Sequence, residues 1–254
     1  MLEQLDLSKK ITKKDFKQIF AELQNKLRLI QHELFNAKVP MIVVFEGWDA
    51  AGKGTAIENL VERLDPRGFK VHRIHKPLRE EELRPFLWRY WIKIPPNGRM
   101  AIFDRSWYGR VIVQRIDKRI KKKQWQEAYR EINNFERQLY DDGAVIVKFW
   151  LHISKKEQKK RFVACEADKY LSWKIEKEDW KHHKQYDQYL KAVEEALEKT
   201  STHYAPWTPV EATDSRWATV KIFNTIISAG LQGLDRMRRK EAAKQVEPME
   251  HTKD

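Results

Sequence analysis

Residues 41–55 read Met41-Ile42-Val43-Val44-Phe45-Glu46-Gly47-Trp48-Asp49-Ala50-Ala51-Gly52-Lys53-Gly54-Thr55. The run 41–45 is short, apolar and rich in β-branched side chains, which is typical of a parallel strand buried on both faces. From Gly47 the chain matches the first seven positions of G-x-x-x-x-G-K-[ST]. Glycines in such a loop let backbone N–H groups converge on phosphate oxygens, and the lysine reaches the outer phosphates. The stretch therefore predicts a phosphate-binding loop between a strand and a helix.

The loop departs from this pattern at one position. Gly54 follows Lys53, where most such loops place the Ser or Thr whose hydroxyl holds magnesium. Thr55 is displaced by one residue, so its hydroxyl faces elsewhere on the first helical turn. Asp49 offers a hard carboxylate oxygen suited to Mg²⁺, so we expect it to help hold the metal. The alternative is that Asp49 only pairs with Lys53.

A second acidic position follows another apolar stretch. Asp104 ends the strand-like run Ile102-Phe103-Asp104, which is the usual place of the second acidic residue in enzymes with such a phosphate-binding loop. Arg105, Arg110 and Arg115 come next. Taken singly, each arginine is explained as well by a surface position or a salt bridge as by a function. The place of Arg105 and Arg110 just after Asp104 favours contact with phosphoryl charge. We predict Asp104 as the second magnesium ligand.

The rest of the chain alternates strands and helices. Periodicity and turn residues predict helices over 13–37, 56–64, 80–93, 124–140, from 154, over 178–199 and after 214, and strands over 69–74, 100–103, 144–151 and 208–212. This alternation is typical of an α/β fold with a parallel sheet covered by helices on both faces. We expect one domain over 1–254, with an N-terminal helical extension at 1–38, a lid at about 154–185 and a disordered tail at 241–254.

Composition limits the class of protein. The chain has 50 Lys plus Arg against 37 Asp plus Glu, a net charge of +13, which attracts polyanions unless the lysines are merely solvated. One cysteine, Cys165, excludes an intramolecular disulfide and suits a reducing compartment. The first residues lack a signal peptide's apolar stretch, and no apolar run approaches the roughly 20 residues that cross a bilayer. We expect a soluble, cytoplasmic protein without a membrane partner.

Two stretches, 45–54 and 104–110, together resemble the polyphosphate kinase 2 family. Further matches lie at 64–69, 84–91, 152–154 with Gln158, 161–162, 172–174 and 205–207. The resemblance implies a three-layer phosphate-loop kinase fold like that of thymidylate kinase, with a parallel sheet, a helical lid and an N-terminal helix. It also implies reversible phosphoryl transfer between inorganic polyphosphate and an adenine nucleotide, AMP, ADP or ATP, with Mg²⁺ as cofactor.

The resemblance also implies roles for particular residues. The catalytic residues are Asp49, Lys53, Asp104 and Arg105, of which Asp49 and Asp104 hold the metal. The phosphate-binding residues are Gly47, Ala50, Ala51, Gly52, Gly54, Thr55, Arg110, the lid arginine Arg161 and Lys174. The eight histidines, including His182 and His183, are predicted to be surface residues, because the acceptor phosphate is already ionised and needs no strong general base. We also expect a homo-oligomer.

Two differences from part of the family bear on which nucleotide the protein phosphorylates. Family members that act mainly on nucleoside diphosphates continue Ser-Trp-Tyr with Asn and end this stretch with Glu, where this chain has Gly109 and Gln114. The stretch 106–110 looks more like members that phosphorylate AMP, so we favour AMP over ADP as acceptor.

Two other functions compete with this one. An ATP-dependent nucleoside monophosphate kinase would share the fold, but it would normally place Ser or Thr after Lys53 and has no reason to be so basic. A nucleic-acid-binding protein would use the basic helices and the Trp side chains, but no usual DNA- or RNA-binding motif is present. We therefore expect no nucleic-acid partner.

Overall fold

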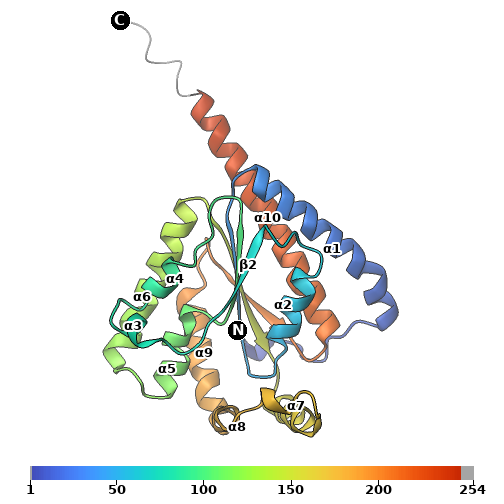
Figure 1. Ribbon diagram of the computed structural model, residues 1–254, viewed down its shortest axis with the longest axis vertical. Coiled ribbons are helices and arrows are strands. Elements are labelled where there is room, and N and C mark those ends of the chain that lie inside the picture. Colours follow the sequence, from blue (N-terminus) through green and yellow to red (C-terminus); the bar gives the residue numbers. More distant parts are fainter. Residues whose placement is uncertain (1, 247–254) are drawn as a thin grey trace, which may run out of the picture.

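The structure is a computed structural model that describes residues 2–246 (Figure 1). Within these residues five parallel strands form one sheet in the order β2-β3-β1-β4-β5. The strands are β1 (Met41–Gly47), β2 (Phe69–Arg73), β3 (Met100–Asp104), β4 (Val145–His152) and β5 (Trp207–Glu211). The strand that leads into the predicted phosphate loop is therefore central, with β3 and β4 on its two sides.

Helices cover both faces of the sheet. They are α1 (Lys13–Asn36), α2 (Lys53–Val61), α3 (Arg79–Glu82), α4 (Trp88–Trp91), α5 (Val113–Ile116), α6 (Lys122–Asp141), α7 (Lys155–Ala167), α8 (Lys177–Lys184), α9 (Tyr186–Thr200) and α10 (Ser215–Val246). In Figure 1, α1, α2 and α10 lie on one face and α3 to α6 on the other. The helices α7 and α8 lie beyond one end of the sheet. This arrangement confirms the predicted α/β fold with a parallel sheet.

Three predicted elements differ from the observed ones. The predicted helix 80–93 is two short helices, because Pro85 lacks an N–H and clashes with the preceding turn. The predicted helix 178–199 is broken at Gln185, which ends α8 and precedes α9. The predicted disorder from 241 does not agree with α10, which continues to Val246, and the remainder of that tail lies outside the described residues.

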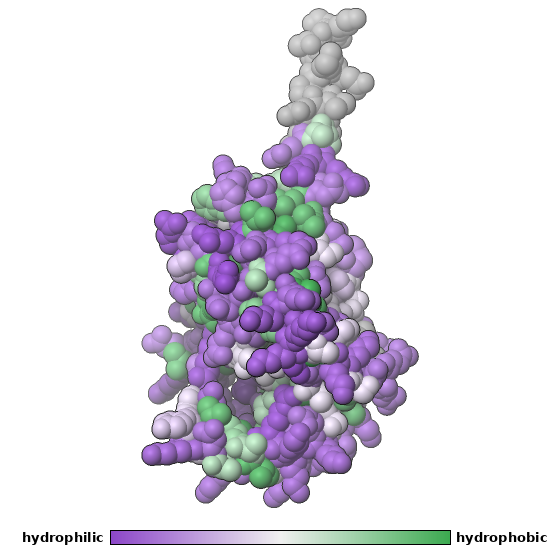
Figure 2. Space-filling view, turned by 90° about the vertical axis from the view of Figure 1, so that its right-hand side faces the viewer, coloured by the Kyte–Doolittle hydropathy of each residue, from purple (hydrophilic) through white to green (hydrophobic). Residues whose placement is uncertain are grey.

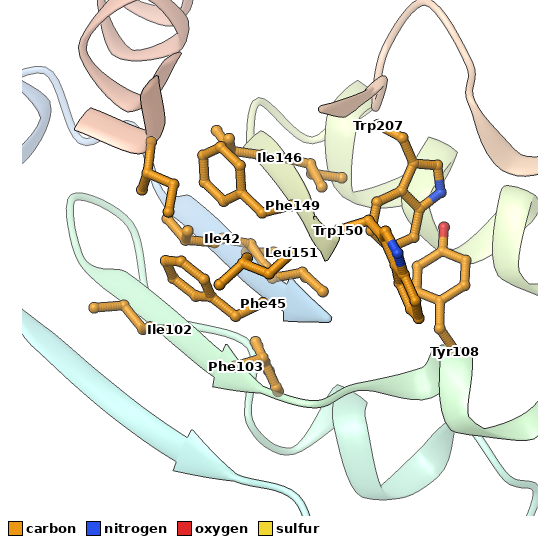
Figure 3. Packing of buried hydrophobic residues seen from close by; sticks show 14 of the residues in the cluster. Ile42, Phe45, Ile102, Phe103, Tyr108, Ile146, Phe149, Trp150, Leu151 and Trp207 are labelled. Carbon is orange, nitrogen blue, oxygen red and sulfur yellow. The ribbon is translucent and has the colours of Figure 1, made fainter. Parts of the chain in front are cut away.

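The core forms where the central strands meet the helices. Figure 3 shows the side chains of Phe45 and Phe149 packed together, and their ring centroids lie 5.3 Å apart. All eight residues of β4 and the first six of β1 are buried. Strands buried on both faces have near-continuous apolar sequences, which explains why β1 was recognisable from its composition alone.

One charged pair lies inside this core. Lys148 of β4 and Glu136 of α6 have fully buried side chains, and the Lys148 Nζ donates to Glu136 Oε2 at 2.7 Å. The same ammonium donates to the Tyr108 hydroxyl and the Thr200 carbonyl, both at 2.8 Å, so its three donors are used. Glu136 Oε1 accepts from Trp107 Nε1 at 3.0 Å and from Tyr108 at 2.8 Å. The network thereby anchors the segment that follows β3.

Breaking this network should destabilise the protein strongly. We expect Glu136→Ala to lower the free energy of unfolding by ~3–5 kcal/mol, because it leaves a buried ammonium unpaired. Urea denaturation followed by circular dichroism measures the change. The matched control is Glu131→Ala, an exposed glutamate on the same helix, which should stay within ~0.5 kcal/mol of the parent. Equal small losses in both variants would contradict the prediction.

Candidate active site

The predicted loop joins the end of β1 to the start of α2. Gly47 has φ +149°, and a Cβ there would lie 2.5 Å from the Leu151 carbonyl oxygen, so only glycine fits against β4. Gly52 precedes α2 with φ +98°, and Ala50 has φ +59°. Left-handed backbone in a residue other than glycine costs free energy and is concentrated at functional sites. The loop is thus formed between strand and helix, as predicted.

The Lys53 side chain folds back over the loop. Its Nζ donates to the carbonyl oxygens of Gly47 at 2.9 Å and Trp48 at 3.0 Å. Burial lowers the pKa of Lys53, and the negative charge of Asp49 opposes that shift. The amine is therefore held beside the loop backbone, in a position suited to the predicted contact with phosphate.

Asp49 pairs with an arginine and a histidine and not with Lys53. Its Oδ1 accepts from Arg105 Nη2 at 2.8 Å, and its Oδ2 lies 3.5 Å from His182 Nδ1. Burial alone would raise the pKa of Asp49, but the hydrogen bond from His182 and the charges of Lys53 and Arg105 outweigh it and hold the pKa well below its usual value. Asp49 is accordingly an ionised carboxylate at neutral pH.

Asp104 and Arg105 reach the same place from β3. Asp104 pairs with Phe45 in the register of β3 and β1, and the Arg105 N–H donates to the Phe45 carbonyl at 3.0 Å. Arg105 has φ +63°, and 55% of its side chain is exposed. The charges of Asp49, Asp104 and Arg105 all influence the pKa of Lys53, and Arg105 is bonded to Asp49. The four predicted catalytic residues therefore form one cluster.

The residues present fit a magnesium ion. Mg²⁺ prefers oxygen ligands and binds one or two carboxylates. The Asp104 side chain makes no hydrogen bond or ion pair within residues 2–246, and Asp49 is ionised. A Cβ at Gly54 would meet nothing within 4 Å, so the missing loop hydroxyl is not excluded by space. Asp49 of the loop and Asp104 of β3 would thus offer Mg²⁺ two carboxylate oxygens in place of the hydroxyl that is missing after Lys53.

The predicted lid arginine contacts the loop backbone. Arg161 of α7 donates from Nη1 to the Ala50 carbonyl at 3.0 Å, and from Nη2 to the carbonyls of Ala212 at 2.8 Å and Thr213 at 3.0 Å. Its Nε donates to Glu157 at 2.9 Å. Arg161 therefore ties α7 to the loop and to the segment after β5. Its phosphate contact stays a prediction.

Two other predicted phosphate ligands lie apart from this cluster. The Arg110 guanidinium packs over the Phe86 ring at 5.0 Å and donates to Gln114 at 3.3 Å. Lys174 is exposed in the short helix Ser172–Lys174, with its Nζ 5.6 Å from the centre of the Trp173 ring. Within the described residues neither is bonded to the loop, and their roles stay predictions.

The structure adds functional candidates that the sequence did not indicate. The prediction that His182 is a surface residue is wrong, since only 16% of its side chain is exposed and it faces Asp49. Glu46 is buried beside the loop, accepts from Ser106 Oγ at 2.7 Å and has a pKa raised by burial. A carboxylate in an otherwise apolar strand could have signalled Glu46. The place of His182 depends on how α8 packs, so no local pattern marked it.

Comparison with known proteins identifies the family. The family model described as polyphosphate kinase 2 matches residues 10–238. The chain belongs to the polyphosphate kinase 2 family. A relative from Pseudomonas aeruginosa named polyphosphate:AMP phosphotransferase is 45% identical over 230 residues, 90% of this chain and 46% of its own. The protein of the same name from Pseudomonas syringae pv. tomato is 41% identical over 240 residues, 94% of this chain and 48% of its own.

Family membership agrees with the architecture. The crystal structure of polyphosphate kinase 2 from Arthrobacter aurescens TC1 matches with a TM-score of 0.87 and 32% identity, over 91% of this chain and 84% of that chain. This likeness confirms the predicted phosphate-loop kinase fold. The chain spans about half the length of the two Pseudomonas relatives. Among the described residues of this family member, no helix is both long and apolar enough to span a bilayer.

Proposed function

We propose that this protein transfers a phosphoryl group between inorganic polyphosphate and an adenine nucleotide, with AMP to ADP favoured and ADP to ATP open to the same site. The observation that carries the proposal is the cluster of Asp49, Lys53, Asp104 and Arg105 at the loop of a family member. The choice of AMP is supported by the stretch 106–110 and by the names of the two Pseudomonas relatives.

Positioning and charge neutralisation carry this chemistry. The transferred phosphoryl group is metaphosphate-like, so the protein needs cations around it more than a proton acceptor. Lys53 and Arg105 bring two positive charges to the loop, and backbone N–H groups at the start of α2 add to them. Asp49 and Asp104 would hold Mg²⁺, which would supply positive charge to neutralise the phosphates.

A basic, hydrophilic surface suits a donor that has no bases to be read. The chain carries a net charge of +13, and Figure 2 shows a face on which hydrophilic side chains predominate. That face is hollowed toward the lower end, where Figure 1 places α7 and α8. Polyphosphate is a linear polyanion, so lysines and arginines are enough to bind it.

One experiment separates the proposed function from its competitors. Adenine nucleotides are followed by chromatography after AMP and polyphosphate are mixed with the protein in Mg²⁺ without ATP. We expect ADP to form. A reaction that requires ATP as donor would instead indicate a nucleoside monophosphate kinase. Retention of single-stranded nucleic acid in a filter-binding assay, with no phosphoryl transfer from either donor, would indicate a nucleic-acid-binding protein.

Salt should weaken the binding of polyphosphate far more than the binding of AMP. If about six phosphates are engaged, with roughly 0.7 counterions released per charge, log affinity falls against log salt with a slope near −4. The apparent KM for long polyphosphate should rise steeply with salt and that for AMP only modestly. Arg105→Gln should flatten the polyphosphate slope by somewhat under one unit. The control Lys123→Gln, 86% exposed on α6, should not change it. Equal salt dependence for both substrates would contradict the proposal that lysines and arginines of this protein bind polyphosphate.

We also propose a cytoplasmic location, a homo-oligomeric state and a single domain over 1–254. The lone cysteine supports a reducing compartment. Exposed Leu29 and Phe35 on α1 support a surface available to a second subunit.

A further inference from the structure

Helix α8 contacts the body of the protein through one charged face. Glu178, Lys181 and His182 are spaced by three and four residues, so they lie on the same side of the helix. Glu178 accepts from Lys76 Nζ at 2.7 Å and from Arg119 Nη2 at 3.0 Å. These contacts join the lid helix to segments that precede it by many residues.

The centre of this contact is Asp117, which caps the C-terminus of α5. Only 2% of its side chain is exposed. Lys181 Nζ donates to its Oδ1 at 3.1 Å, Arg119 Nη2 lies 2.9 Å from its Oδ2, and His182 Nε2 lies 3.8 Å from its Oδ1. Two of these three partners come from α8, so Asp117 would lose them if α8 moved away.

His182 extends the contact to the phosphate loop. Its ring lies between two carboxylates, with Nε2 toward Asp117 and Nδ1 3.5 Å from Asp49 Oδ2. The next residue acts on the same aspartate indirectly, because His183 Nδ1 lies 2.8 Å from Gln158 Oε1 and Gln158 Nε2 donates to the Asp49 carbonyl at 3.2 Å. The position of α8 therefore bears on both the side chain and the backbone of Asp49.

A metal ion is the other explanation for this cluster. Ligand atoms of Asp117, Glu178 and His182 lie within 4.8 Å of one another. However, Lys76, Arg119 and Lys181 are ion-paired with the two carboxylates, so three cations already face two anions. A divalent cation would be repelled by this surplus, which favours an ion-paired contact over a metal site.

We propose that Asp117 is a positioning residue that holds α8 against the rest of the protein, and that His182 couples the position of α8 to the position of Asp49. The kinetic part of the proposal rests on the proposed function, whereas the structural part does not. The pairs are partly solvated, with 57% of the Lys181 side chain exposed, so each contributes only modestly. Ion pairs of this strength would hold α8 in its closed position and still allow it to move when substrate enters.

The structural part is tested without substrate by hydrogen–deuterium exchange on the full chain. Asp117→Asn and Lys181→Gln should each raise exchange in residues 177–184 about fivefold. The double variant should add little to Asp117→Asn, because that change already removes the pair with Lys181. Exchange in β1 and β4 should not change. Salt at ~1 M should bring the parent close to the variants. The matched control is Asp141→Asn, an ion-paired aspartate at the end of α6.

Three results would overturn the proposal that Asp117 holds α8 in place. Unchanged exchange in α8 would show that Asp117 does not hold it. Increased exchange throughout the chain would show that Asp117 only supports the fold. Protection of residues 177–184 by micromolar Zn²⁺ or Mn²⁺, reversed by EDTA, would show that the cluster is a metal site.

The kinetic part is tested with AMP and polyphosphate. Asp117→Asn should raise the apparent KM for AMP about fivefold and change kcat by less, since Lys53 and Asp104 stay in place. A loss confined to kcat would contradict the proposal that Asp117 holds the lid closed over substrate. If the parent transfers no phosphoryl group at all, the proposed function fails. The exchange experiment would still decide whether Asp117 holds α8 in place.

Discussion

We expect Lys53→Ala to lower kcat for phosphoryl transfer from polyphosphate by about a hundredfold or more, since electrostatic stabilisation dominates this chemistry. Lys53 is the loop's own cation, held over the backbone by Gly47 and Trp48. Burial lowers its pKa, which means that the charge costs the folded protein free energy. Removing the charge should therefore not destabilise the fold, and the variant should unfold at nearly the parent's urea concentration. Initial rates and urea denaturation measure the two effects.

The control for this experiment retains the shape of the side chain. Lys53→Met preserves most of the aliphatic stem without the ammonium, so its rate should fall as far as that of Lys53→Ala. Lys123→Ala, which removes an exposed lysine on α6, should leave the rate unchanged. Near-parental activity in either Lys53 variant would remove this residue from the site.

The second large effect is expected from Asp104→Asn, which should lower turnover by about a hundredfold or more. The carboxylate of Asp104 is free of hydrogen bonds and ion pairs to other residues in 2–246, so its replacement should leave the fold intact. If it holds magnesium, the remaining activity should need more Mg²⁺ for its half-maximal rate. Initial rates across a magnesium titration measure both quantities.

Asp49→Asn provides the comparison, because Asp49 already has protein partners. It pairs with Arg105 and faces His182, so it could act as a structural anion or as a metal ligand. A raised magnesium requirement would identify a ligand, and an unchanged magnesium curve a structural role. Gly54→Ser offers a rescue, since there is space for the side chain and its hydroxyl stands where other loops hold the metal. Full parental activity in Asp104→Asn would contradict the two-carboxylate site.

Part of this site could be predicted because its signals are local. The buried strand, the loop and the first turn of α2 are consecutive, so backbone preference and glycine spacing define them without distant contacts. Asp104 was recognisable in the same way, as the polar end of an apolar strand. The helix predicted from 154 also depends on a local signal, since the Ser154 hydroxyl accepts from the N–H of Glu157 three residues later and caps α7.

Tertiary structure alone decided which of these residues meet. The sheet order places β3 beside β1, which brings Arg105 to Asp49 although they are 56 residues apart in the sequence. Arg161 reaches the Ala50 carbonyl across 111 residues, where it braces the loop. The approach of His182 follows from the break at Gln185, which separates α8 from α9. Periodicity reports which face of an element is buried, but a polar contact between distant elements depends on how they pack, and no local pattern encodes that.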